Sequence, residues 1–107
     1  RPYLGLRYVS IYSEMKEKNN LTVVYGVLVK AGASTNELAV IPGSPADKAG
    51  IVENDIILEV DGVKLDDKTS LASVIRQKSV GQVINLKILH KGAEKNISIT
   101  LEVAKDS

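Results

Sequence analysis

The most informative change of pattern along the chain lies between residues 44 and 62, where a short helix signal gives way to a strand signal. Ser44 precedes Pro45, and Asp47 follows three residues after the serine, which is the order expected at a capped helix N-terminus. Gly50 stands where the end of a helix favours a left-handed residue. This segment therefore predicts a helix of a single turn.

A half-buried strand and a tight turn are expected directly after this helix. Asn54 tolerates left-handed backbone angles better than most residues, so it suits the turn into the strand. The strand pattern is an alternation of Ile56, Leu58 and Val60 with Ile57, Glu59 and Asp61. Asp61 and Gly62 then form a dipeptide that favours a tight hairpin turn.

Further elements are expected on both sides of this run. The N-terminal part predicts a strand over residues 4–12, a short capped helix over 13–19, a buried strand over 21–29 and a polar loop over 30–37. A second helix is expected over residues 70–78, because Leu71, Val74, Ile75 and Lys78 fall on one helical face.

The C-terminal part predicts a β-hairpin. It pairs residues 82–90 with 95–103 across a loop at 91–94. One apolar row consists of Ile84, Leu86 and Ile88, and the row opposite consists of Ile97, Ile99, Leu101 and Val103. These patterns predict a mainly β fold with two to three short helices, a five- to six-stranded antiparallel sandwich or partly open barrel, as a single domain over residues 1–107.

Composition narrows the function classes. The 107 residues suit one domain, and 44% of them are hydrophobic. The net charge is +1 with scattered Lys and Arg, so no nucleic-acid partner is expected. Without Cys and with one His, the chain cannot form a structural zinc site, and no cofactor or metal is expected. No run approaches the roughly 18–20 apolar residues that span a bilayer, so no direct membrane insertion is expected either.

Three segments resemble PDZ domains in the form carried by trypsin-like serine proteases of the HtrA/Deg type. The run from Ser44 to Gly62 resembles their signature segment, with Asn54 where the family usually has Gly. Residues 1–6, Arg-Pro-Tyr-Leu-Gly-Leu, resemble their carboxylate-binding loop, and residues 81–92 resemble their penultimate strand and hairpin turn. The resemblance covers nearly the whole chain and implies a PDZ fold with a circularly permuted strand order.

The resemblance also implies a binding site. A PDZ domain binds an extended peptide by strand addition, here between an edge strand at 6–12 and the helix at 70–78. Loop amides then form a nest for the terminal carboxylate, for which Gly5 is needed. The carboxylate-binding residues are expected to be Arg1, Tyr3, Leu4, Gly5 and Leu6, and the groove residues Arg7, Tyr8, Val9, Leu71, Val74, Ile75 and Lys78. Val74 fits the core of an ordinary amphipathic helix equally well.

No catalysis is expected within the chain. It has no Gly-x-Ser-x-Gly motif, and its one histidine, His90, stands at a hairpin end, where a catalytic triad is hard to complete. We expect a fragment of a longer, extracytoplasmic protein.

The resemblance implies the regulatory module of a trypsin-like serine endopeptidase in protein quality control, with the protease domain in the same chain. Its ligands would be peptides or protein C-termini with a hydrophobic last residue. Two alternatives stay open: a non-proteolytic docking module of an envelope or secretion protein, and the PDZ domain of a membrane-embedded metalloprotease or a tail-specific peptidase.

Overall fold

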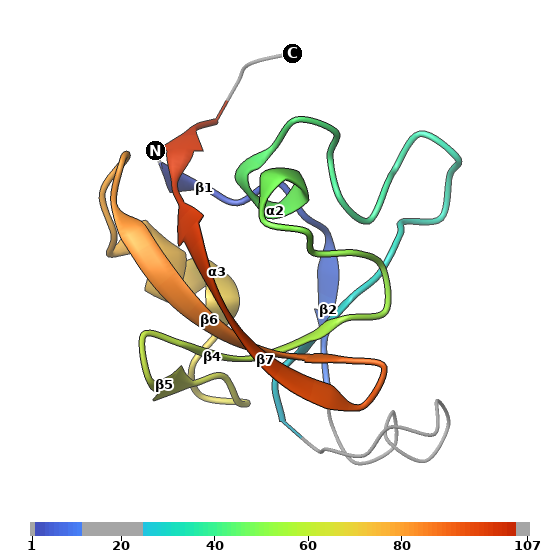
Figure 1. Ribbon diagram of the computed structural model, residues 1–107. Helices are drawn as coiled ribbons and strands as arrows, with labels where there is room; N and C mark the ends of the chain where they lie inside the picture. Colours follow the sequence, from blue (N-terminus) through green and yellow to red (C-terminus); the bar gives the residue numbers. More distant parts are fainter. Residues whose placement is uncertain (1, 12–24, 105–107) are drawn as a thin grey trace.

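The computed structural model describes residues 2–11 and 25–104 (Figure 1). Its strands are β1 (Pro2–Tyr3), β2 (Tyr8–Ser10), β3 (Val27–Val29), β4 (Ile56–Val60), β5 (Val63–Lys64), β6 (Val83–His90), β7 (Ala93–Thr100) and β8 (Glu102–Val103), and its helices are α2 (Pro45–Lys48) and α3 (Leu71–Arg76). Every strand pair is antiparallel, which confirms the predicted mainly β class.

The strands form two sheets. The larger has the order β2-β3-β4-β6-β7, with β5 paired to β4, and over the described residues it does not close into a barrel. The smaller joins the first strand, β1, to the last, β8, and Figure 1 shows the two ends of the described chain side by side there. Because α3 also contacts β1, this helix lies beside the smaller sheet.

The central strand β4 is buried on both faces, whereas the alternating pattern predicted one exposed face. A β-bulge between Ile57 and Glu59 shifts the alternation. As a result, Ile57 and Val60 both enter the larger of two clusters of buried apolar residues, which is called the main core below. The opposite face is covered by a smaller cluster that consists of Ile11, Leu28, Ile56 and Leu58. The prediction was wrong because burial here depends on packing against the neighbouring strands.

The last hairpin has a tighter loop than the predicted four residues. Lys91 and Gly92 alone connect the strands, with φ of +50° and +81°, and His90 pairs directly with Ala93. Two successive positive φ values match a turn whose twist suits paired strands. Val103 was wrongly included in the buried row, since it is 58% exposed and pairs with Pro2 in the smaller sheet.

The signature segment forms the elements that its residues predict. Ser44 is the N-cap of α2, and its hydroxyl accepts a hydrogen bond of 3.2 Å from the Asp47 amide. The Asp47 carboxylate accepts from the Gly43 amide at 2.8 Å, one residue further back than in a reciprocal capping box. Gly50 and Asn54 have φ of +87° and +78°, so both predicted left-handed positions are confirmed.

Other predicted boundaries shift or fall outside the described residues. α3 begins after the N-cap Ser70 but ends at Arg76, two residues earlier than predicted. Residues 30–37 contain no helix or strand, as predicted. The helix expected over 13–19 and the first four residues of the strand expected over 21–29 lie outside the described residues, and β3 forms the last three residues of that strand. In the two described ranges no helix is long and apolar enough to cross a membrane.

Candidate functional site

A cavity of about 440 Å³ lies between α3 and the segment that leads from β1 into β2. Its lining consists of Pro2, Tyr3, Leu4, Gly5, Leu6, Tyr8, Ile41, Leu71, Ala72, Ile75, Arg76 and Ala104. Most of these side chains are apolar, so the cavity is suited to an aliphatic or aromatic group. Among the lining residues only Arg76 carries a charge, and it makes no ion pair within the described part of the chain.

The helix side of the cavity is built into the hydrophobic core. Ser70 caps α3 by accepting a hydrogen bond of 3.1 Å from the Ser73 amide. Leu71 and Ile75, one helical turn apart, are 1% and 7% exposed and pack into the main core as well as lining the cavity. The wall is therefore formed by side chains whose positions are set by core packing.

On the other side, β2 presents an open sheet edge. The Arg7 carbonyl accepts from the Lys30 amide at 3.0 Å, and the Ile11 amide donates to the Gly26 carbonyl at 3.1 Å. Since backbone groups alternate in direction along a strand, these bonds and the strand register place the Arg7 carbonyl, the backbone groups of Val9 and the Ile11 amide toward β3. The Arg7 amide donates to the Ala39 carbonyl at 2.8 Å. The amides and carbonyls of Leu6, Tyr8 and Ser10 consequently point out of the sheet edge.

The loop between β1 and β2 supplies free backbone donors. Gly5 has φ of +82°, a backbone region that disfavours other residues. The amides of Gly5 and Leu6 donate no hydrogen bond within residues 2–11 and 25–104, and both residues line the cavity. Two adjacent free amides are a site for an anion, and Arg76 adds a positive charge to the same cavity.

The structure brings most of the predicted site residues together. Those that line the cavity are Tyr3, Leu4, Gly5, Leu6, Tyr8, Leu71 and Ile75. Those that do not are Arg7, Val9, Val74 and Lys78. Arg1 lies outside the described residues.

Strand geometry accounts for Arg7 and Val9. Successive side chains of a strand point to opposite faces, so these two lie on the other face from Leu6 and Tyr8. The Arg7 guanidinium instead donates a hydrogen bond of 2.8 Å to the Leu38 carbonyl. Val74 packs into the main core, the alternative left open by the sequence.

Lys78 lies past the end of α3 and pairs with the turn between β4 and β5. Its ammonium is 2.9 Å from the Asp61 carboxylate, which also accepts from the Asn85 amide at 2.8 Å. The hydrogen bond from Asn85, and next the one from Lys78, hold the pKa of Asp61 below its ordinary value of 3.8. This ion pair connects the residues that follow α3 to the turn between β4 and β5.

Because the pKa of Asp61 is lowered in the folded protein, its contribution to stability is present above pH 3.8 and is lost as the pH falls through the lowered value. We expect Asp61→Asn to lower the free energy of unfolding by about 1 kcal/mol at neutral pH, and the difference to shrink in acid. Urea unfolding at a series of pH values from neutral to below 3.8 measures this difference in the free energy of unfolding. Asp67→Asn, in the exposed turn before α3, is the control, and identical pH profiles for the two variants would contradict the assignment.

Several lining residues were missed. Ala72 and Arg76 stand one position after Leu71 and Ile75, so a wider helical stripe would have found them. Ile41 is brought in by a long-range bridge between Leu6 and Val40, for which the local sequence gives no signal.

His90 and Asp55 form a titratable pair outside the cavity, and its contacts are structural. His90 Nδ1 lies 2.6 Å from Asp55 Oδ1, and the same carboxylate accepts from the Val52 amide at 3.1 Å. The pair thus ties the end of β6 to the turn that precedes β4. Among the described residues no group of three or more His, Cys, Asp or Glu side chains could hold a metal ion.

The fold and the cavity define a PDZ domain. The family model described as "PDZ domain" matches residues 2–101, so the chain belongs to the PDZ domain family. Within that family it is similar to HtrA/DegP-type serine proteases.

Three curated relatives illustrate this similarity. The chain is 33% identical over 109 residues to the "Serine protease Do-like HtrA" of Lactobacillus helveticus, covering 95% of this chain and 24% of that protein. It is 29% identical over 104 residues to the protein of the same name in Bacillus subtilis, covering 95% and 23%. It is 31% identical over 102 residues to the "Probable periplasmic serine endoprotease DegP-like" of Marinomonas sp., covering 95% and 20%. The chain therefore spans a quarter or less of these relatives.

Two solved structures share the fold. The "HtrA-type protease AlgW with decapeptide" matches with a TM-score of 0.75 and 26% identity, covering 100% of this chain and 30% of that one. The "HtrA3 PDZ Domain Bound to a Phage-Derived Ligand (FGRWV)" matches with a TM-score of 0.72 and 26% identity, covering 95% and 86%. The second match extends over nearly all of both chains.

Proposed function

We propose that this PDZ domain binds the C-terminal end of an extended peptide. The observation that carries the proposal is the pair of free amides at Gly5 and Leu6, which lie in the lining of an apolar cavity. A terminal carboxylate placed on these amides gains charge-assisted hydrogen bonds. Arg76, the charged residue among the described residues of the lining, adds a favourable positive charge. Within residues 2–11 and 25–104, no carboxylate side chain lines the cavity to repel the ligand carboxylate.

The rest of the peptide pairs with β2. Leu6, Tyr8 and Ser10 direct their amides and carbonyls out of the sheet edge, so they offer a ladder to an added antiparallel strand. With its carboxylate at the loop before β2, the peptide runs antiparallel to this strand and between it and α3. The affinity of the domain for the peptide comes from main-chain hydrogen bonds, which do not depend on the ligand sequence. The selectivity of the domain comes from the cavity.

The cavity selects the last side chain of the ligand. Leu4, Leu71 and Ile75 provide an apolar wall, so an aliphatic side chain is favoured over a charged one. The five-residue ligand of the similar HtrA3 PDZ domain, FGRWV, ends in the aliphatic residue Val, which supports this choice. With few hydrogen bonds and one buried side chain, we expect a dissociation constant on the order of micromolar, about −8 kcal/mol.

We further propose that the chain is one domain of a longer serine endopeptidase, which it regulates or supplies with substrate. Three relatives named as serine proteases, each about four to five times as long, support this parent. A protease domain in the same chain is then its first partner. The name of the Marinomonas relative supports an extracytoplasmic location, in the periplasm.

An amide chemical-shift titration tests the binding site. A peptide with a free C-terminal carboxylate and a last valine is expected to shift the amides of residues 4–11 and 71–76 (the loop, β2 and α3). The same peptide ending in lysine is the control and is expected to produce much smaller shifts at equal concentration. Shifts confined to β7, the other edge of the larger sheet, would contradict the proposed groove.

A further inference from the structure

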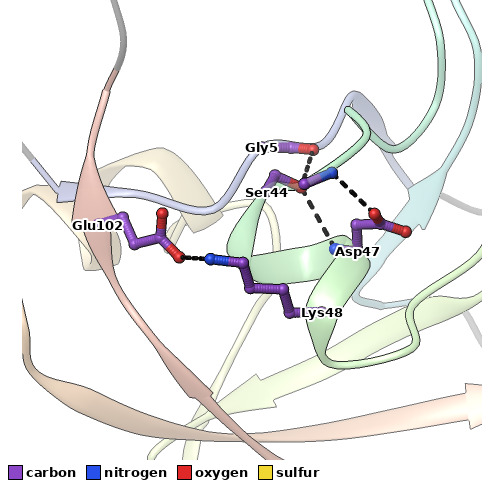
Figure 2. A network of polar contacts seen from close by, with 6 residues as sticks. Gly5, Ser44, Asp47, Lys48 and Glu102 are labelled. Carbon is purple, nitrogen blue, oxygen red and sulfur yellow. Dashed lines mark hydrogen bonds and ion pairs between the residues drawn. The ribbon is translucent and has the colours of Figure 1, made fainter.

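The N-terminus of α2 packs directly against the loop that carries the two free amides. Ser44 is 4% exposed, and its hydroxyl donates a hydrogen bond of 3.3 Å to the Gly5 carbonyl. The same oxygen accepts from the Asp47 amide at 3.2 Å, so one side chain caps the helix and contacts the loop (Figure 2). Figure 2 also shows the Lys48–Glu102 ion pair, 2.8 Å long, which joins α2 to β8.

Two backbone bonds reinforce this contact. The Ile41 amide donates to the Gly5 carbonyl at 2.9 Å, and the Ala46 amide donates to the Leu4 carbonyl at 2.9 Å. Both carbonyls of the loop are therefore held on the α2 side. In a trans peptide the amide points opposite to the carbonyl of the same plane, so the amides of Gly5 and Leu6 are turned away from α2.

Ser44 also limits how far the loop can rotate. A Cβ atom built on Gly5 would lie 2.2 Å from the Ser44 Cβ and 2.6 Å from its hydroxyl oxygen. Such a close approach leaves no gap between the loop and the helix N-terminus. The two peptide planes are thus fixed before any ligand arrives.

We propose that Ser44 is a positioning residue for the carboxylate site: through the Gly5 carbonyl it orients the Leu6 amide toward the ligand. This inference rests on the proposed function and adds to it the group that prepares the donors. Donors that are already oriented bind an anion more tightly, because binding then orders fewer groups. The signature serine of the helix start thus acts on the site without touching the ligand.

The test compares a peptide that ends in a free carboxylate with the same peptide ending in a carboxamide. Ser44→Ala is expected to weaken binding of the carboxylate peptide about three- to tenfold, in the range of one neutral hydrogen bond, and to change binding of the carboxamide peptide much less. Ser44→Gly is the second variant, because glycine remains an acceptable N-cap while lacking the hydroxyl. Asp47→Ala is the matched control, since it weakens the same helix start through Gly43 and leaves the Gly5 contact in place.

The outcomes separate the inference from the proposed function. In the free proteins, the Leu6 amide resonance is expected to shift in both Ser44 variants and to remain in place in Asp47→Ala. If wild type binds both peptides equally, the proposed carboxylate site is wrong. If wild type discriminates and both Ser44 variants keep the same affinity ratio, the site stands and the role of Ser44 is refuted. A ratio that falls equally in Asp47→Ala refutes it too, since general loosening of α2 then suffices.

Discussion

Gly5→Ala is expected to weaken peptide binding by at least about 30-fold, or about 2 kcal/mol. Gly5 has φ of +82°, and an alanine in that region is strained by about 1–3 kcal/mol. In addition, its Cβ would meet the Ser44 Cβ at 2.2 Å, so the loop has to move away from α2. Moving the loop turns the Gly5 and Leu6 amides out of their binding geometry.

The control for this variant is Gly50→Ala. Gly50 has a similar φ of +87°, but a Cβ there meets no atom of the described part of the chain within 4 Å. Gly50→Ala is therefore expected to lower stability by about 1 kcal/mol and leave affinity unchanged. Calorimetric titration of both variants, alongside thermal unfolding, gives the comparison. Wild-type affinity in Gly5→Ala, or an equal loss in Gly50→Ala, would show that the loop is not the site.

Sequence reasoning succeeded where a feature depends on a few adjacent residues. The N-cap Ser44, the left-handed Gly50 and the turn at Asp61 and Gly62 each follow from local backbone and side-chain preferences, and the structure confirms them. The segment Tyr3–Leu6 could be predicted to lie together for the same reason, because its residues are contiguous and contain the glycine whose φ is +82°, and all four residues line the cavity.

Sequence reasoning failed where the answer lies in long-range contacts. Lys78 has the helical spacing expected of a groove residue, but α3 ends at Arg76. Lys78 instead forms an ion pair with Asp61, which lies in the turn after β4. The bulge that buries both faces of β4 also depends on its pairing with β6. Helical or strand periodicity contains no information about either contact.

The signature run from Ser44 to Gly62 has a larger role than its pattern suggests. By pattern it is a scaffold of a helix, a strand and a turn. In the structure its first residue contacts Gly5, and Ala46 holds the Leu4 carbonyl. The motif and the loop between β1 and β2, 39 residues apart, are therefore one packed unit, which no local pattern could show.

The second large effect concerns the ligand. Replacing the terminal carboxylate of the peptide by a carboxamide is expected to weaken binding about 10- to 100-fold, because hydrogen bonds to a charged group contribute about 1.5–3 kcal/mol. The carboxamide loses the negative charge that favours the Gly5 and Leu6 amides and Arg76, while its last side chain and its strand pairing are unchanged. The comparison thus isolates the anion site from the rest of the groove.

The most direct measurement is isothermal titration calorimetry of the wild-type domain with these two peptides, identical except for the terminal group. The dissociation constants are expected to differ by at least about tenfold in favour of the free carboxylate. Raising the salt concentration should narrow the gap, since exposed charges are screened. Equal dissociation constants for the two peptides would contradict the account, because the free amides beside the cavity would then not be a carboxylate site.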